Sequence, residues 1–280
     1  MHTTRFAPSP TGLLHLGHAF AAITAADAAD GGTFLLRIED LDRSRSRPEF
    51  ELAIDEDLAW LGLTWKKPVL HQSARLEIYR SAVAMLNAEG LVYPCFCTRQ
   101  DIEAEVARAP QAPHRFDYKI YPGTCRGLSA AERAEAIARG QPHVMRLDVN
   151  EAAARITPLS FMEMGAGPGG EHGVISVNPT VLGDIVLARK DVPVAYHLAV
   201  VMDDAFQGVS LVTRGNDLFA ATHVQRLLQA LLKLPQPLYA HHRLILDVHG
   251  RKFSKREQAV TLRYLREHGT SNREIRGRLT

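Results

Sequence analysis

Two histidines near the start of the chain, His15 and His18, follow a segment that breaks regular structure. Residues 8–12 contain two prolines and a glycine, and an alanine-rich stretch that favours a helix begins near Gly17. Free backbone N–H groups and the positive dipole end at a helix start attract phosphate oxygens. The pattern indicates an anion or nucleotide site, and a purely structural helix cap is the alternative interpretation of these two residues.

A second group of residues suited to phosphate chemistry lies far downstream. Lys252 and Lys255 flank Ser254 after a strand-like run. Two ammonium groups beside a hydroxyl suit a polyphosphate, because each can follow charge that moves onto a leaving pyrophosphate. Taken alone the motif is short, and a solvated loop is the alternative.

The order of the predicted elements that must position these residues indicates an α/β fold. In the first part of the chain, apolar runs and breakers predict a strand at 3–7, a helix at 18–30 and a strand at 33–38. A right-handed βαβ unit in a parallel sheet is the economical fold for that order. Further predicted elements are helices at 49–61, 72–89, 195–202, 220–232 and 260–268, and strands at 181–188, 208–213 and 244–246.

The character of the chain changes between these two α/β stretches. A polar helix at 98–107, irregular sequence at 110–127, a strand at 143–149 and a glycine-rich loop at 165–173 are predicted. Ser129 and Glu132 fit a capping box that opens a helix over 130–139. We therefore expect four parts, namely a first catalytic half at 1–90, an inserted module at 91–178, a second catalytic half at 179–247, and a loop with a basic segment at 248–280.

The chain has three cysteines, Cys95, Cys97 and Cys125, and no secretion signal precedes them. Reduced thiols or a metal site are then expected rather than disulfides. Three thiolates are one ligand short of a closed tetrahedral zinc site. His114 and Tyr121 are the candidate fourth ligands, and chemical softness together with the high pKa of a phenol favours the histidine.

Composition and charge are those of a globular protein. The 280 residues are 46% hydrophobic and 23% charged, which argues against wholesale disorder. The apolar run at 19–29 is interrupted by Thr24 and Asp27, so neither a signal peptide nor a membrane span is expected. We therefore expect a cytoplasmic protein. Residues 251–280 carry nine Lys or Arg and three Glu, which fits either a solvated tail helix or an acidic or nucleic-acid partner.

Together the two phosphate motifs resemble the paired signatures of class I aminoacyl-tRNA synthetases. Residues 15–18 (HLGH) are similar to the HIGH sequence and 252–256 (KFSKR) to the KMSKS sequence. Residues 5–12 (RFAPSPTG), 37–40 (RIED) and 196–199 (YHLA) resemble the glutamyl members of that class. The resemblance implies a Rossmann-like catalytic domain with a parallel sheet, interrupted by a zinc-bearing insertion.

The resemblance also implies roles for individual residues. Glutamate has two carboxylates and one ammonium, so its pocket needs cationic forks and an acid. The implied glutamate contacts are Arg5, Ala7, Ser9, Glu39, Tyr196 and Arg214. The implied contacts to ATP, which binds with magnesium, are Thr11, Gly12, His15, Gly17, His18 and Lys255. The implied catalytic residues are His15, His18, Lys252, Ser254 and Lys255, and the implied zinc ligands are Cys95, Cys97, Tyr121 and Cys125, with Tyr121 in place of His114.

Two features depart from full-length glutamyl enzymes. Val200 stands where they have an asparagine, and only 24 residues follow Arg256, so no anticodon-binding domain is expected. The chain therefore resembles the truncated relatives that activate glutamate without tRNA and attach it to queuosine in the anticodon of tRNA(Asp). The alternatives are a truncated enzyme that charges the 3′ end of tRNA(Glu), a small-molecule adenylyltransferase or ligase, and a non-catalytic RNA-binding protein. A monomer without membrane partners is expected.

Overall fold

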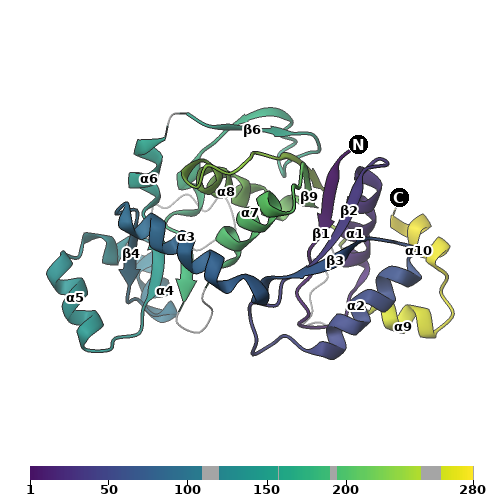
Figure 1. The fold of residues 1–280 in the computed structure, drawn as a ribbon, viewed down its shortest axis with the longest axis horizontal. Helices are drawn as coiled ribbons and strands as arrows, with labels where there is room; N and C mark the ends of the chain where they lie inside the picture. Colours follow the sequence, from purple (N-terminus) through teal and green to yellow (C-terminus); the bar gives the residue numbers. More distant parts are fainter. Residues whose placement is uncertain (109–119, 157, 190–193, 247–259, 280) are drawn as a thin grey trace.

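The computed structural model describes residues 1–108, 120–156, 158–189, 194–246 and 260–279. Figure 1 shows the N-terminal strands, α1, α2 and the C-terminal helices on one side, and β4 with α5 on the other. Helices α7 and α8 lie between them. Within the described residues, no helix is both long enough and apolar enough to cross a membrane.

A parallel sheet begins the fold. Strands β1 (Thr3–Phe6), β2 (Thr33–Ile38) and β3 (Lys66–His71) pair in parallel in that order. Helix α1 (Leu16–Ala28) joins β1 to β2, which confirms the predicted strand–helix–strand unit. Helix α2 (Pro48–Trp60) joins β2 to β3 and starts with a proline, whose missing N–H and fixed φ suit the first helical turn.

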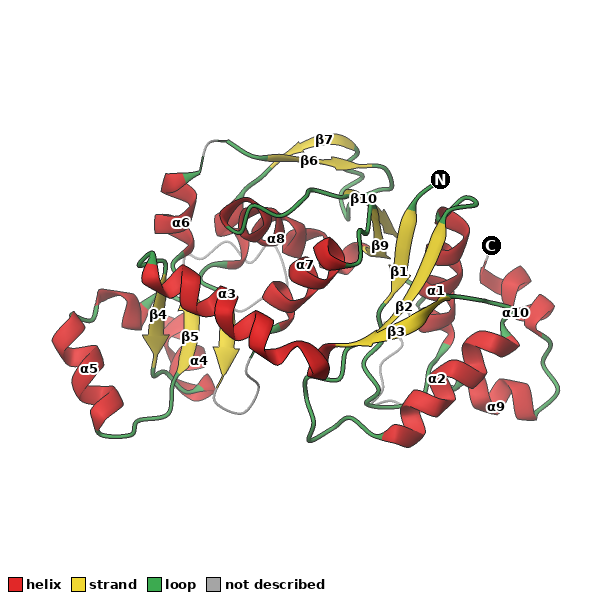
Figure 2. Ribbon diagram, viewed as in Figure 1, coloured by secondary structure: helices red, strands yellow, loops and turns green. Residues whose placement is uncertain are grey.

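A second sheet continues from the free side of β1, as Figure 2 shows. Its order is β7 (Gly173–Ser176), β6 (Ser160–Glu163), β10 (Leu238–His242) and β9 (Leu211–Gly215), and only β7 is antiparallel to its neighbour. The backbone N–H of Ser210 donates to the Thr3 oxygen at 3.0 Å, which brings β9 beside β1. Helix α7 (Tyr196–Phe206) precedes β9, and α8 (Phe219–Leu231) joins it to β10.

Two predicted strands differ from the structure: the one at 181–188 is right only at its end, and the one at 244–246 is wrong. The range 181–188 contains the end of a 3-10 helix (Pro179–Leu182), a glycine with φ 62°, Gly183, and only then strand β8 (Val186–Arg189). The range 244–246 is not a strand, and among the described residues the last strand is β10, which ends at His242. The apolar side chain of Ile245 instead packs on the core around α1, so tertiary packing rather than sheet pairing accounts for that apolar run.

A third, antiparallel sheet lies apart from the other two. Its order is β4 (Val92–Cys95), β5 (Val144–Leu147) and β8. The helices around it are α4 (Arg99–Arg108), α5 (Ala130–Ala138) and α6 (Val149–Arg155). The capping box of Ser129 and Glu132 at α5 is confirmed. Strand β8, which follows residue 178, belongs to this sheet, whereas β6, which precedes residue 178, belongs to the second sheet. The sheets therefore do not divide at the predicted limits of 91–178, and those limits stay a prediction.

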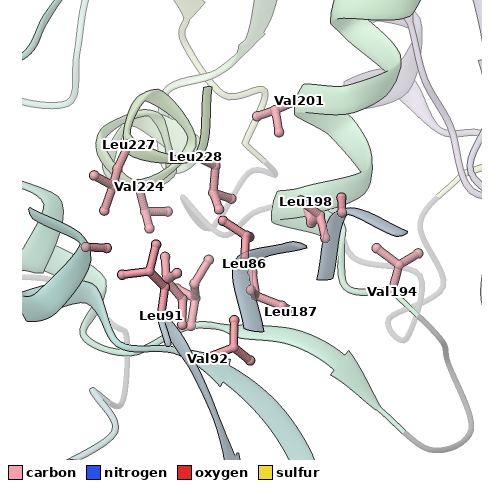
Figure 3. Packing of buried hydrophobic residues seen from close by; sticks show 14 of the residues in the cluster. Leu86, Leu91, Val92, Leu187, Val194, Leu198, Val201, Val224, Leu227 and Leu228 are labelled. Atoms are coloured by element: carbon pink, nitrogen blue, oxygen red, sulfur yellow. The ribbon is translucent and has the colours of Figure 1, made fainter. Parts of the chain in front are cut away.

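Two large apolar cores hold these layers together. Helix α3 (Leu76–Ala88), which follows a 3-10 turn (Gln72–Arg75), packs with α7, α8 and the antiparallel sheet, and Figure 3 shows this cluster around Leu86, Leu198 and Leu228. The second core lies between α1, α2 and the first sheet. Helices α9 (Leu262–Glu267) and α10 (Asn272–Leu279) bury Leu262 and Ile275 in it, so the basic C-terminal segment is not simply a solvated tail.

Candidate active site

A cavity of about 420 Å³ opens where β1, β9 and α7 meet. Five of the six residues implied for glutamate line it, namely Arg5, Ala7, Glu39, Tyr196 and Arg214. The sixth, Ser9, lines an adjoining cavity of about 400 Å³ together with Thr11. His18 and Glu39 line both cavities, so the fold brings the implied glutamate residues beside two of the residues implied for ATP, Thr11 and His18.

Asp204 on α7 binds two arginines, one of which, Arg5, lines the cavity. Arg5 donates to both carboxylate oxygens of Asp204, at 2.9 and 3.3 Å, and Arg37 donates to one at 2.7 Å. All three side chains are buried. Burial alone would raise the pKa of Asp204, but the two guanidinium groups outweigh it and lower that pKa. Arg5 therefore enters the cavity wall as one half of a bidentate ion pair.

Glu39, at the end of β2, is the acid of the cavity. Its carboxylate lies 3.5 Å from Arg37 Nη2. Burial raises the pKa of Glu39, and the nearby charges of Arg37 and Arg5 only partly oppose it. A substrate ammonium at this position would favour the ionised carboxylate, which is the chemistry expected of an amino-group contact.

Arg214 on β9 also lines the cavity and is held by three hydrogen bonds. Its Nε donates to His241 Nε2 at 3.1 Å, Nη1 to Gln225 Oε1 at 2.7 Å, and Nη2 to Thr222 Oγ1 at 2.6 Å. A guanidinium has five N–H donors, and these bonds use three. The side chain is thus fixed in orientation while donors remain for a carboxylate.

His15 and His18 cap the start of α1 reciprocally. The Gly17 N–H donates to His15 Nδ1 at 3.1 Å, and the His15 N–H donates to His18 Nδ1 at 3.2 Å. Because both Nδ1 atoms accept, each neutral ring carries its proton on Nε2, where it can donate to an oxygen anion. A Cβ at Gly17 would lie 3.1 Å from the His15 ring, so the glycine makes room for that imidazole.

The segment with Lys252, Ser254 and Lys255 lies outside the described residues, and so does His114. The chain is described again from residue 260, and Thr261 forms an antiparallel bridge with His15. The Leu262 N–H donates to the Leu14 oxygen at 2.8 Å. The described residue Thr261 therefore lies beside the histidine motif.

Helix α7 contributes two side chains to the cavity wall and a partly buried histidine between them in the sequence. Tyr196 and Val200 line the cavity, and Val200 is buried there as an apolar wall. His197, between them, has a buried Nδ1 without a hydrogen-bond partner in the described structure. Burial and the charge of Arg214 lower the pKa of His197 to about 4, so this ring is neutral.

The three cysteines converge at the end of β4. Their sulfurs all lie within 4.8 Å of one another, and those of Cys97 and Cys125 are 3.5 Å apart. The hydroxyl of Tyr121 lies 3.8 Å from Cys97 Sγ and accepts from the Cys125 N–H at 2.8 Å. Four candidate metal ligands thus meet at one point, which also forms a small core of its own.

Several residues that hold the site were missed from the sequence. They are Arg37, Glu163, Asp204, Thr222, Gln225 and His241. One signal was available for Asp204: two adjacent acids interrupt the apolar sequence of α7, and acids buried in a helix need partners. Arg37 lies within the 37–40 motif but was given no role, and Glu163 carries no local signal because its partner His241 lies 78 residues away.

Comparisons with known proteins agree with this arrangement. Residues 2–276 match the family model described as tRNA synthetases class I (E and Q), catalytic domain. A glutamyl-Q tRNA(Asp) synthetase of Rhodobacter capsulatus is 49% identical over 98% of both chains. A glutamate–tRNA ligase of Aquifex aeolicus is 40% identical over 95% of this chain and 54% of its own length. The crystal structure of a glutamate-tRNA synthetase from Elizabethkingia anophelis superposes with a TM-score of 0.74 at 28% identity, covering 96% of this chain and 54% of that one.

Proposed function

The chain belongs to the catalytic-domain family of class I tRNA synthetases for glutamate and glutamine, and from this premise we propose that it activates glutamate with ATP, without tRNA, and transfers it to queuosine in the anticodon of tRNA(Asp). The names of similar chains support the proposal, since relatives from three organisms at 41 to 49% identity are each called glutamyl-Q tRNA(Asp) synthetase. This chain covers 98% of the Rhodobacter relative and about half of the glutamate–tRNA ligase from Aquifex.

The observation that carries the proposal is the charge pattern of the cavity. Arg5 and Arg214 lie on its walls with Glu39, so two cations and one acid meet within about 420 Å³. Glutamate presents the complementary set of two carboxylates and one ammonium. Planar guanidinium forks bind carboxylates bidentately, which favours an acidic amino acid over a neutral one of equal size.

Activation requires no protein nucleophile. The α-carboxylate of glutamate attacks the α-phosphorus of ATP in line, an O–P bond forms, and pyrophosphate leaves with the electrons of the broken O–P bond. ATP brings magnesium, which neutralises its phosphates. His15 and His18 donate from Nε2 to phosphate oxygens. Lys255 stabilises the negative charge that develops on pyrophosphate, and Lys252 and Ser254 support it. Positioning and charge stabilisation therefore supply the catalysis.

Transfer follows from the adenylate. A hydroxyl of the queuosine cyclopentenediol attacks the acyl carbon, loses its proton, and forms an ester while AMP leaves. The RNA must then reach the cavity, and basic residues of 251–280 are the proposed phosphate contacts. Among them, Arg263 and Arg266 lie within 3.7 and 3.0 Å of Glu56, so their charge is partly offset. Binding should weaken steeply with salt, whereas a salt-independent affinity would argue against these contacts.

ATP–pyrophosphate exchange, screened across amino acids without tRNA and followed by transfer to RNA, tests the proposed function. Exchange with glutamate alone, and label transfer to tRNA(Asp) that contains queuosine but not to tRNA(Asp) that lacks it, is the expected result. Transfer to tRNA(Glu) instead would favour a truncated glutamate–tRNA ligase, and this chain is 40% identical to the Aquifex enzyme of that name. Exchange with a different acid would reject the glutamate assignment.

His15→Ala and Arg5→Ala separate the two halves of the site. We expect His15→Ala to slow exchange by roughly 100- to 1,000-fold with little change in glutamate affinity, because its Nε2–H donates to phosphate. Arg5→Ala should weaken glutamate binding directly. Equal loss of glutamate binding in both variants would reject this division.

We further propose that Cys95, Cys97, Cys125 and Tyr121 hold one structural zinc ion. A tetrahedral site with Zn–S bonds of about 2.3 Å places sulfurs roughly 3.8 Å apart, close to the 3.5 Å between Cys97 and Cys125. The donor set fits, since soft thiolates select zinc and the Phe96 N–H donates to Cys125 Sγ at 3.3 Å as a supporting contact. The ion would join β4 to the turn at Thr124–Gly127.

Metal analysis of two variants tests the fourth ligand. Tyr121→Phe should bind zinc more weakly than the unchanged protein under competition with a chelator, whereas His114→Ala should bind it equally. The reverse result would assign the fourth position to His114. A metal content near zero in the freshly purified, unchanged protein would reject the zinc site.

A further inference from the structure

A line of three buried side chains crosses the second sheet behind Arg214. Glu163 lies on β6, His241 on β10 and Arg214 on β9, which are neighbouring strands in Figure 2. Glu163 Oε2 lies 2.5 Å from His241 Nδ1, and His241 Nε2 lies 3.1 Å from Arg214 Nε. The side chains of Glu163 and His241 are fully buried. Only Arg214 of the three lines the cavity.

The chemistry of the three groups fixes where the protons are. A guanidinium can only donate, so His241 Nε2 must accept from Arg214 and cannot carry a proton. The proton of the neutral ring is then on Nδ1, where it is donated to Glu163. Burial and the charge of Arg214 lower the pKa of His241, while hydrogen bonds from the ring and backbone outweigh the burial of Glu163 and lower its pKa.

We propose that Glu163 and His241 are positioning residues that hold Arg214 in the orientation needed to bind a substrate carboxylate. The inference rests on the proposed function, in which Arg214 contacts glutamate. Glu163 selects the Nδ1–H form of His241, and that form offers Arg214 Nε an acceptor. With Nε held at this point, the remaining donors of the guanidinium face the cavity in one fixed direction.

The backbone around the pair is held equally closely. Glu163 Oε1 accepts from the N–H groups of His241 and Gly165, each at 2.8 Å. A Cβ at Gly165 would lie 2.2 Å from the His241 oxygen, so the glycine is required for the start of the 165–173 loop to approach β10. This glycine-rich loop therefore supports the same histidine.

Glu163→Gln tests the proposal without a change in shape. The Gln oxygen can keep the two backbone bonds, which leaves its NH2 group facing His241 Nδ1. If the ring carries its proton on Nε2, that N–H faces the N–H of Arg214. If it keeps the proton on Nδ1, that N–H faces the NH2 group of the glutamine. We expect the glutamate KM in ATP–pyrophosphate exchange to rise by about 10- to 100-fold, with the ATP KM unchanged and kcat changed less than about threefold.

Tyr239→Phe is the matched control. Tyr239 is buried beside His241 on β10, and its hydroxyl accepts from Gln229 at 2.9 Å. The variant loses one buried hydrogen bond in the same layer but leaves the line to Arg214 intact, so its glutamate KM should stay within about twofold of the original. An equal rise in Tyr239→Phe and Glu163→Gln would overturn the proposal.

Two further measurements separate positioning from loss of structure. Nitrogen-15 NMR of the imidazoles should show His241 protonated on Nδ1 in the unchanged protein and on Nε2 in Glu163→Gln, provided that both unfold at similar temperatures. Adding His241→Gln to Glu163→Gln should restore the glutamate KM to within about fivefold, because an amide can turn its oxygen toward Arg214. Failure of that rescue, or the Nε2 form in the unchanged protein, would reject the positioning role. If the unchanged protein shows no glutamate-dependent exchange, the proposed function fails, while the NMR result still decides the proton position.

Discussion

Two regions of the molecule each bury one aspartate. Asp204 binds Arg5 in the wall of the cavity, and Asp57 lies in the contact between α2 and α9, which we call the seam. Asp204 accepts from Arg5 at 2.9 Å and from Arg37 at 2.7 Å. Asp57 is fully buried, neither of its oxygens accepts a hydrogen bond within the described residues, and Arg266 lies 3.5 Å away. Burial is nearly the same in the two places, so the difference lies in the partners.

The electrostatic consequences are opposite. Two guanidinium groups lower the pKa of Asp204 against the effect of burial. Burial raises the pKa of Asp57 to about 6, and the charges of Arg266 and Arg263 reduce that effect only in part. A buried carboxylate thus stabilises the fold when close donors replace its lost water and costs stability when they do not.

Both regions bear on the site. Asp204 holds Arg5 in the cavity wall, and α9 begins directly after Thr261, which pairs with His15. The cavity wall therefore uses a buried charge to fix a binding residue. The seam is held mainly by apolar contacts, with Leu262 buried against the core of α1 and α2. The buried charge of Asp57 opposes that packing.

Asp204→Ala should produce the largest effect. Removing this carboxylate leaves Arg5 and Arg37 buried without their common partner, which we expect to lower the free energy of unfolding by about 3 to 5 kcal/mol at pH 7.5. Glutamate-dependent exchange should be lost with it. Urea unfolding followed by circular dichroism measures the change.

Glu135→Ala is the control for that measurement. Glu135 pairs with Arg139 on the exposed surface of α5, where 65% of the acid's side chain is accessible. Its removal should change stability by less than about 0.5 kcal/mol. A cost for Asp204→Ala as small as that of the control would remove the distinction between the two buried aspartates.

Asp57→Asn should act in the opposite direction. The folded pKa of about 6 lies above the ordinary 3.8, so the folded state binds the proton more tightly than the unfolded state, and ionisation costs stability as pH rises from about 4 to above 6. We expect the variant to be more stable than the original by about 1 kcal/mol at pH 7.5, with no difference near pH 4. Unfolding in urea across that pH range tests it, and a variant less stable at pH 7.5 would contradict the prediction.

Local patterns predicted those parts of the fold that short stretches of sequence determine. The βαβ unit follows from the alanine-rich stretch and glycine breakers around 18–30 and the apolar run at 33–38, and the capping box from the spacing of Ser129 and Glu132. The strand expected at 244–246 failed because the same apolar run can pair in a sheet or pack on a neighbouring core, and only the tertiary structure selects between them.

The sequence predicted residues of the candidate site that face the cavity, but not the buried residues that support them. Arg5, Glu39 and Arg214 were identified by family resemblance, and they do line one cavity. Their supports were not predictable, since Asp204 is 199 residues from Arg5 and Glu163 is 78 residues from His241. Such partners depend on the order of strands in the sheet, which no spacing in the sequence encodes.

Arg266→Ala should give the smallest effect and tests whether the seam is governed by Asp57. Arg266 lies 3.0 Å from Glu56 and 3.5 Å from Asp57, and its side chain is 25% exposed. Its loss should raise the pKa of Asp57 further and cost about 0.5 kcal/mol at pH 7.5, but less at pH 5, where Asp57 is largely protonated. In the Asp57→Asn background the same change should cost clearly less, because only the exposed pair with Glu56 remains to be broken. A cost that is equal in both backgrounds would mean that Arg266 acts through Glu56 alone and that the charge of Asp57 does not control this seam.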